Sequence, residues 1–211
     1  MAAQNTVSSP APGPQAAAQA ALVAGLGDSG LAMARWLARA GWRVRVADSR
    51  SDPPMRAALL AELPQAELHL GGLDAQALQG VQLLALSPGL APGQPPAAAL
   101  VEAARAAKVP VVGEIELFAQ ALAQLREERD YRPVLLGITG TNGKTTTARL
   151  AGLMLQACGR DAAVAGNIGP CALDVLGERL AQGRLPQAWV LELSSFSSKP
   201  PPRCAATLPR S

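Results

Sequence analysis

An apolar run that ends in a glycine-rich loop and leads directly into a helical pattern occurs twice in this chain. The first run covers residues 21–26 and leads into Gly25-Leu26-Gly27-Asp28-Ser29-Gly30, and the second covers 133–138 and leads into the loop 139–143. Alternation of strands and helices predicts parallel sheets covered by helices, so the sequence predicts an α/β fold. The other apolar runs that alternate with helical patterns lie at 43–47, 81–87, 109–112, 162–165 and 189–193.

The pattern starts again near residue 133, which predicts two domains joined by a connector. We expect a first domain at 21–112, a connector at 113–132 and part of a second domain at 133–196. Residues 1–20 carry no charge and have neither the basic start and apolar core of a signal peptide nor the arginines of a transit peptide, so we expect a disordered leader. Residues 197–211 contain four prolines, which cannot continue a sheet.

The net charge of +3 comes entirely from residues 197–211, which hold three basic residues and no acidic one. The basic excess therefore argues neither for nor against nucleic acid, and we predict no nucleic-acid partner. An apolar content of 49% excludes a wholly disordered chain. No run approaches the roughly 18 uninterrupted apolar residues of a transmembrane helix, so we predict no membrane insertion.

The three cysteines, Cys158, Cys171 and Cys204, lack CxxC spacing, which indicates free thiols in a reducing cytoplasm.

The second glycine-rich loop predicts a phosphate-binding site. Gly140-Thr141-Asn142-Gly143-Lys144-Thr145-Thr146 follows a predicted strand and opens a predicted helix. Glycines let several backbone N–H groups face one anion at a helix N-terminus, where Lys144 would neutralise the β- and γ-phosphates and Thr145 would offer a hydroxyl to Mg²⁺. The motif is a variant of the general pattern, because position 138 is Ile instead of Gly. A glycine-rich turn capped by threonine is the alternative.

The first glycine-rich loop has the spacing of a dinucleotide-binding fingerprint. Asp48 ends the next predicted strand, about 20 residues on, where an acidic residue contacts a ribose hydroxyl in such sites. The glycines indicate that the backbone can approach a phosphate at a helix N-terminus, without indicating whose phosphate it is. A tight turn between strand and helix is the alternative.

Glu192 and Asn167 follow strands that should end at the same sheet edge as the phosphate loop. A carboxylate at that edge can hold Mg²⁺ directly or through water, and a solvent-facing strand end is the equally weighted alternative. Asn167 lies between glycine and isoleucine and can equally shape a turn. His69, the single histidine, sits in a short stretch flanked by polar residues and is expected on the surface, not as a ligand.

These segments together resemble the Mur ligase family over about residues 21–196. The phosphate loop alone also fits folylpolyglutamate synthases, whereas GLGxSG, the Asp-Ser-Arg strand end and the Gly-Glu-Ile-Glu-Leu-Phe connector are specific to the D-glutamate-adding ligases. The segments that carry the resemblance are GLGDSG, Asp48-Ser49-Arg50, Ser87-Pro88-Gly89, Gly113-Glu114-Ile115-Glu116-Leu117-Phe118, GITGTNGKTTT, GNIG and LELSSF.

The resemblance implies a Rossmann-like parallel-sheet domain that binds UDP instead of NAD, followed by an incomplete P-loop ATPase domain. It implies ATP and Mg²⁺ as cofactors, with Arg50 facing the diphosphate, Thr145 and Glu192 holding the metal, and Asn167 near substrate and metal. The implied catalytic residues are Lys144, Asn167 and Glu192. The implied UDP-substrate positions are Asp28, Ser29, Asp48, Ser49, Arg50, Gly89 and Asn167, and the implied ATP positions are Gly140, Thr141, Asn142, Gly143, Lys144, Thr145 and Thr146.

The implied reaction joins D-glutamate to UDP-N-acetylmuramoyl-L-alanine through an acyl phosphate, a cytoplasmic step of peptidoglycan precursor synthesis. The family's D-glutamate domain should lie beyond residue 196. After Phe196 this sequence continues with Ser-Ser at 197–198, whereas the family continues with Gln-Leu. A shift of the reading frame by one base would produce this change. We therefore expect a non-native tail at 197–211 and no ligation by the chain as written.

Two other classes of function remain open at this stage. One is a non-catalytic nucleotide-binding module with two phosphate sites. The other is an NAD-dependent oxidoreductase, which the first loop alone would suggest but which leaves Gly140–Thr146 unexplained.

Overall fold

Two parallel β-sheets form the framework of the computed structural model, which describes residues 19–166 and 169–193. The first sheet has the strand order β3-β2-β1-β4-β5, and every neighbouring pair in it is parallel. Its strands are β1 (Ala20–Ala24), β2 (Arg43–Asp48), β3 (Glu67–Leu70), β4 (Leu83–Leu86) and β5 (Val111–Val112). This is the order of a Rossmann-like half-sheet, and it confirms the predicted α/β class.

The second sheet has the order β6-β8-β7 and is also parallel. Its strands are β6 (Val134–Ile138), β7 (Ala162–Gly166) and β8 (Ala188–Glu192). Because β8 lies in the middle, the ends of β6 and β7 flank Glu192. The carboxyl ends of all three strands therefore meet at one edge.

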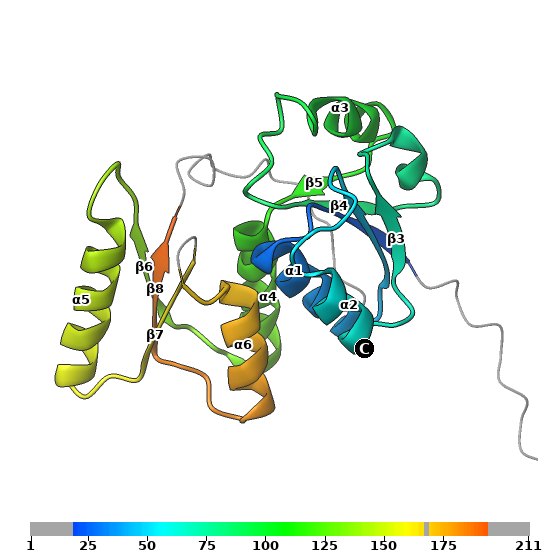
Figure 1. Ribbon diagram of the computed structural model, residues 1–211. Helices are drawn as coiled ribbons and strands as arrows, with labels where there is room; N and C mark the ends of the chain where they lie inside the picture. Colours follow the sequence, from blue (N-terminus) through cyan, green and yellow to red (C-terminus); the bar gives the residue numbers. More distant parts are fainter. Residues whose placement is uncertain (1–18, 167–168, 194–211) are drawn as a thin grey trace, which may run out of the picture.

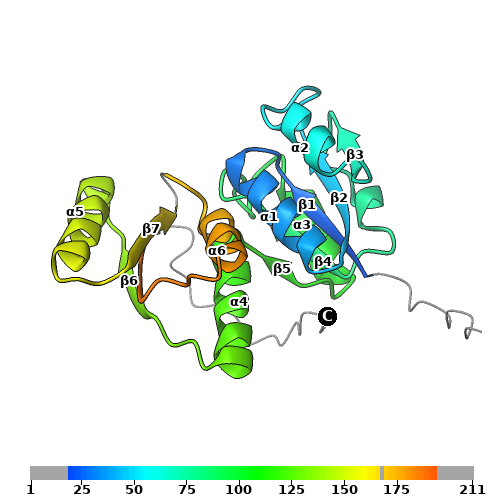
Figure 2. The ribbon, with the colours of Figure 1, turned by 90° about the horizontal axis from the view of Figure 1, so that it is seen from below.

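Helices cover both faces of each sheet (Figures 1 and 2). On the first sheet, α1 and α2 lie on one face, and α3 and the 3₁₀ helix η1 lie on the other. On the second sheet, α5 lies on the outer face and α6 on the face toward the first sheet. The helices are α1 (Asp28–Arg39), α2 (Arg56–Glu62), η1 (Ala75–Leu78), α3 (Ala98–Ala106), α4 (Glu114–Arg129), α5 (Lys144–Ala157) and α6 (Ala172–Ala181).

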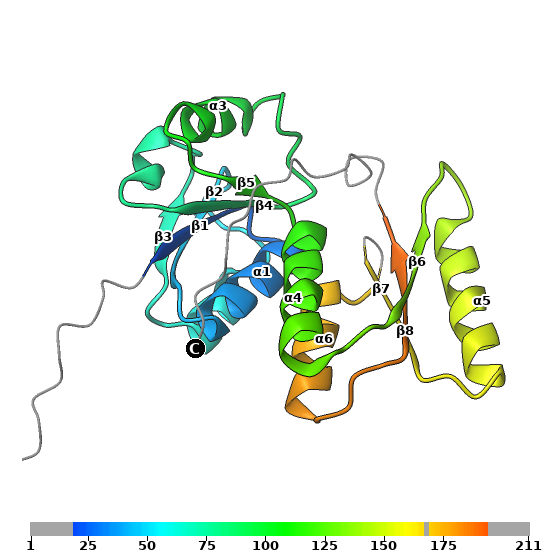
Figure 3. The same ribbon diagram turned by 180° about the vertical axis from the view of Figure 1, so that it is seen from behind.

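Helices α1, α4 and α6 lie between the two sheets (Figure 3). One hydrophobic core runs through these helices from the first sheet to the second. Phe118 of α4 packs edge-on against Trp189 of β8, with ring centroids 4.8 Å apart at 73°. The Trp189 Nε1–H donates to the Tyr131 hydroxyl over 2.9 Å, and that hydroxyl donates to the Pro186 carbonyl over 2.6 Å. The segment predicted as a connector thus forms part of the core that joins the two sheets.

Strand β1 shows why the opening apolar run predicts a central strand. Ala21 and Val23 face the core that includes α1, whereas Leu22 and Ala24 face the core that includes α3. All four side chains are fully buried. A parallel strand with both faces covered needs apolar residues at every position, so the run is continuous and not alternating.

The structure differs from the sequence-based expectations in several short segments. Strand β1 begins at Ala20, inside the predicted leader, because Ala20 pairs with Arg43 and its N–H donates to the Gln82 side chain. The elements α2, β3 and η1 were not predicted from the sequence. His69 lies exposed in β3, as expected. The predictions for residues 1–18, for Asn167 and for 194–211 fall outside the described residues.

Several large apolar side chains are exposed on β6 and α5 of the second sheet. Val134 and Leu135 of β6 are 58% and 53% exposed, and three apolar side chains of α5 are exposed as well. Within residues 19–166 and 169–193, β6 is an edge strand. The exposed side chains of α5 are Leu150, Leu153 and Met154. Edge strands and apolar patches of this kind favour association with other polypeptide.

Candidate functional site

Close backbone packing shapes the first glycine-rich loop. Gly25 has φ of +89°, and a Cβ on Gly30 would stand 1.9 Å from the Gly25 carbonyl oxygen. Helix α1 can therefore approach the end of β1 only with glycine at position 30. By contrast, a Cβ on Gly27 would meet nothing within 4 Å, so the loop is open at the position that precedes α1.

Asp48 ties this loop to the end of β2. Its Oδ2 accepts the Leu26 N–H over 2.6 Å, and its Oδ1 accepts the Arg50 N–H over 2.9 Å. The Arg50 guanidinium donates to both oxygens, over 2.9 and 2.8 Å. Asp48 is 2% exposed, whereas the Arg50 side chain is about half exposed. Asp48 therefore orders the loop, and Arg50 carries the charge that faces solvent beside it.

These hydrogen bonds set the charge state of Asp48. Burial alone would raise the pKa of this carboxyl, but the Arg50 side chain and the N–H groups of Leu26 and Arg50 lower the pKa to about 2. A depressed pKa means that the ionised form stabilises the fold. The contribution is present above the unfolded-state pKa of about 4 and is lost as the pH falls toward about 2.

We expect Asp48→Asn to lower the free energy of unfolding at pH 7 by about 2 kcal/mol, which corresponds to the pKa difference. The deficit should shrink as the pH falls from about 4 toward 2, because the wild-type protein then loses the same contribution. Urea unfolding across this pH range measures both effects. Asp52→Asn is the matched control, because Asp52 is highly exposed and pairs with Arg56 only at 3.6 Å. A deficit that does not change with pH would contradict the assignment.

A cavity of about 420 Å³ lies between the two sheets. Of the residues predicted for a UDP substrate, it brings together Asp28, Ser29 and Gly89. The cavity is not lined by the other predicted UDP residues outside position 167, which are Asp48, the last residue of the neighbouring strand β2, and the two residues after it, Ser49 and Arg50. Five further lining residues were not predicted as site residues from the sequence, namely Ser87, Pro88, Gly166, Gly169 and Cys171.

The second glycine-rich loop surrounds a smaller cavity of about 260 Å³. Gly140 and Gly143 have φ of +144° and +74°, so both occupy backbone conformations that favour glycine. Lys144, the first residue of α5, donates from Nζ to the Gly140 carbonyl over 2.8 Å. The residues that line the cavity are Thr141, Asn142, Gly143, Lys144, Thr145, Thr146 and Glu192.

Glu192 brings an unsatisfied carboxylate to this cavity. It ends β8 and is 2% exposed, so the alternative of a solvent-facing strand end is wrong. Within the described part of the chain, neither Oε1 nor Oε2 has a hydrogen-bond partner. A buried carboxylate without partners is costly unless a cation binds it, and oxygen ligands suit Mg²⁺. The donor set of Glu192 and the Thr145 hydroxyl therefore fits this metal.

The two cavities are lined by residues at the ends of adjacent strands. Gly166, which lines the larger cavity, is the register partner of Glu192, which lines the smaller one. A Cβ on Gly166 would stand 2.2 Å from the Glu192 carbonyl oxygen, and the φ of Gly166 is +133°. Only glycine allows β7 and β8 to end this close together. A group held in one cavity thus lies next to the other.

Within residues 19–166 and 169–193, no helix is both long and apolar enough to span a membrane. No group of three or more His, Cys, Asp and Glu side chains is placed there to hold a metal ion.

The fold and these cavities define a parallel α/β protein with two strand–glycine loop–helix units, each beside a cavity. Residues 19–113 match the family model for the Mur ligase MurD-like N-terminal domain. The chain is 57% identical over 175 residues to a UDP-N-acetylmuramoylalanine–D-glutamate ligase of Ralstonia nicotianae and 54% identical over 180 residues to that of Bordetella avium. Each match covers 83% of this chain and 35% of the relative.

This chain therefore belongs to the Mur ligase family, in its MurD-like group. It spans about a third of the length of the curated relatives that it matches. Among solved structures, the UDP-N-acetylmuramate:L-alanyl-gamma-D-glutamyl-meso-diaminopimelate ligase of Neisseria meningitides is 22% identical, with a TM-score of 0.45. That match covers 84% of this chain and 52% of the solved chain.

Proposed function

We propose that this chain supplies the UDP-sugar site and the ATP site of a ligase that adds D-glutamate to UDP-N-acetylmuramoyl-L-alanine, in cytoplasmic peptidoglycan precursor synthesis. The observation that carries this proposal is the adjacency of two cavities at the ends of β7 and β8. A ligase that activates a carboxylate with ATP needs the acyl end of one substrate beside the γ-phosphate of the other. The names of the curated relatives supply the substrate class.

In the larger cavity, the N-terminus of α1 would receive the diphosphate. Asp28 and Ser29 begin that helix, and its partial positive charge attracts an anion. Arg50, held in place by Asp48, adds a full positive charge at the neighbouring strand end. Gly89 lets the backbone approach the ligand from the β4 side, and exposed Ser49 offers a hydroxyl.

In the smaller cavity, the loop 140–146 would hold the phosphates of ATP. The first residues of α5 line the cavity, so the free N–H groups of this helix start would bind phosphate oxygens, and Lys144 would leave the Gly140 carbonyl to neutralise phosphate charge. Thr145 and Glu192 would hold Mg²⁺, which when bound neutralises charge on the phosphate oxygens. Asn167, directly after Gly166, is proposed to act between substrate and metal.

The proposed chemistry has two steps that follow from the substrates. First, an oxygen of the alanyl carboxylate attacks the γ-phosphorus of ATP, the bond to ADP breaks, and an acyl phosphate forms. Second, the amine of D-glutamate attacks the acyl carbon, the amide bond forms, and phosphate and a proton leave. Positioning and charge neutralisation dominate catalysis of phosphoryl transfer, which fits a site built from a glycine loop, one lysine and one carboxylate.

Two alternatives receive less support from the contacts. In an NAD-dependent oxidoreductase, the acid after the second strand serves a ribose hydroxyl, whereas both oxygens of Asp48 are already engaged by Leu26 and Arg50. A non-catalytic module with two phosphate sites does not account for the buried, unpartnered carboxylate of Glu192 within the described residues.

We expect the 211-residue chain to bind UDP-N-acetylmuramoyl-L-alanine more tightly than NAD in calorimetric titrations. Arg50→Ala should weaken that binding about tenfold or more, because it removes a charge-assisted contact. Arg105→Ala is the matched control, because Arg105 is an exposed arginine near the end of α3. Tighter binding of NAD than of the UDP-sugar would overturn the proposed function, and equal losses in the two variants would overturn the role of Arg50.

A further inference from the structure

The described residues include three buried carboxylates, and the proposed function uses only two of them. Asp48 orders the first loop, and Glu192 faces the phosphate cavity. The third is Glu114, the first residue of α4, which is 5% exposed. It lies in the connector motif at residues 113–118, to which the sequence analysis gave no role.

Glu114 reaches across to the start of α6. Its Oε1 accepts the N–H of Leu173 over 3.2 Å, and the N–H of Ala172 beside it also favours the ionised carboxylate by lowering its pKa. The first N–H groups of a helix lack partners within the helix, and Cys171, the residue that precedes α6, offers no side-chain cap of its own. Glu114 therefore caps α6 from another helix. Burial raises the pKa of Glu114, and these N–H groups oppose that rise.

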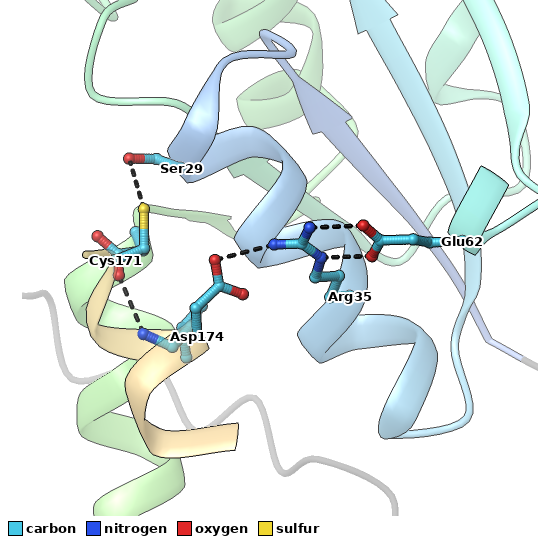
Figure 4. A network of polar contacts seen from close by, with 7 residues as sticks. Ser29, Arg35, Glu62, Cys171 and Asp174 are labelled. Atoms are coloured by element: carbon cyan, nitrogen blue, oxygen red, sulfur yellow. Dashed lines mark hydrogen bonds and ion pairs between the residues drawn. The ribbon is translucent and has the colours of Figure 1, made fainter. Parts of the chain in front are cut away.

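The acidic residue already present in the first turn of α6 has a different partner. Asp174 pairs at 3.0 Å with Arg35 of α1, which also binds Glu62 of α2 (Figure 4). Asp174 thus ties α6 to α1. The start of α6 is consequently held from two sides, by Glu114 on α4 and by Arg35 on α1.

The segment that leads into α6 forms a wall of the larger cavity. Gly166, Gly169 and Cys171 line it, and the Gly166 N–H donates to the Pro170 carbonyl over 3.1 Å. The Cys171 thiol donates to the Ser29 hydroxyl over 3.7 Å, across the gap between the two sheets (Figure 4). Burial, and next the Glu114 carboxylate, raise the pKa of Cys171 to about 11, so this thiol stays protonated near neutral pH.

We propose that Glu114 is a positioning residue. By capping α6 it fixes the cavity wall formed by Gly166, Gly169 and Cys171 against Ser29, and so directs the sugar–alanyl end of the substrate toward the phosphate loop. This inference rests on the proposed function and names the element that aligns its two sites. UDP itself would contact the domain of the first sheet, at the start of α1 and at Arg50. Glu114 should therefore affect what the sugar and alanyl groups add to the affinity, and not the affinity for UDP.

Amide exchange tests the cap without any ligand. In the 211-residue chain, Glu114→Ala should speed exchange of the Leu173 amide about tenfold or more, as expected for loss of one charge-assisted hydrogen bond. Amides of β1 and β2 should keep their rates. Glu114→Gln retains an acceptor oxygen and should exchange within a few-fold of wild type. Glu116→Ala is the matched control, because it removes another acid from the first turn of α4. Unchanged Leu173 exchange in Glu114→Ala overturns the proposal.

Titration with UDP and with UDP-N-acetylmuramoyl-L-alanine tests the consequence. Wild type should bind the full substrate more tightly than UDP, and Glu114→Ala should lose most of this difference while its affinity for UDP stays the same. Glu114→Gln should restore the difference. A full difference in Glu114→Ala overturns the positioning role. Equal affinities in wild type would instead count against the proposed function, and the amide exchange would still decide whether Glu114 caps α6.

Discussion

Lys144→Ala should weaken binding of Mg-ATP to this chain about tenfold to a hundredfold, the effect of losing a charge-assisted contact with phosphate. Lys144 begins α5 at the rim of the smaller cavity, and its ammonium reaches only the Gly140 carbonyl among the described residues. Since that contact is exposed, its loss should change the free energy of unfolding by no more than about 0.5 kcal/mol. Calorimetric titration with Mg-ATP and urea unfolding measure the two quantities.

Arg149→Ala provides the control for this experiment. Arg149 is exposed on the same helix and does not line the cavity, so its removal changes the net charge equally. We expect ATP affinity in that variant to stay within about twofold, given salt screening of exposed charges. Unchanged affinity in Lys144→Ala, or equal losses in both variants, would show that the loop 140–146 does not hold the phosphates through this lysine.

Gly30→Ala should destabilise the fold by about 3 kcal/mol, at the upper end of the range for overpacked sites. The added Cβ would stand 1.9 Å from the Gly25 carbonyl oxygen, so a backbone segment has to move. Neither β1 nor α1 can shift at a low cost in free energy, because β1 is buried on both faces and α1 packs against α6 in the shared core. The predicted consequence is a lower midpoint in urea with an unchanged slope.

Gly27→Ala is the matched substitution within the same loop. Its Cβ would meet nothing within 4 Å, and the φ of −101° at Gly27 is open to any residue. We expect its free energy of unfolding to stay within about 0.5 kcal/mol of wild type, as for other unstrained surface changes. Similar losses in Gly27→Ala and Gly30→Ala would mean that the close approach of α1 to the loop is not what requires glycine at position 30.

Much of the fold could be predicted because its elements have strong local signals. The buried strands β1, β4 and β8 are continuous apolar runs, as parallel strands covered on both faces require. The glycine loops marked the starts of α1 and α5, since a helix that receives an anion or packs against a strand end needs glycine there. By contrast, α2, β3 and η1 are short and lack clear periodicity. They are held by contacts such as those of fully buried Leu59.

The sequence by itself determined the α/β class, the Mur-type order of motifs and the residues of both glycine loops, because each depends on residues that are neighbours along the chain. Tertiary structure decided the rest. Glu192 is buried because β8 lies between β6 and β7, and its register with Gly166 places the two cavities side by side. Glu114 meets Leu173 across 59 positions, through helices that pack in a shared core. No local pattern encodes such a contact, since only the packing of distant segments brings its donor and acceptor together.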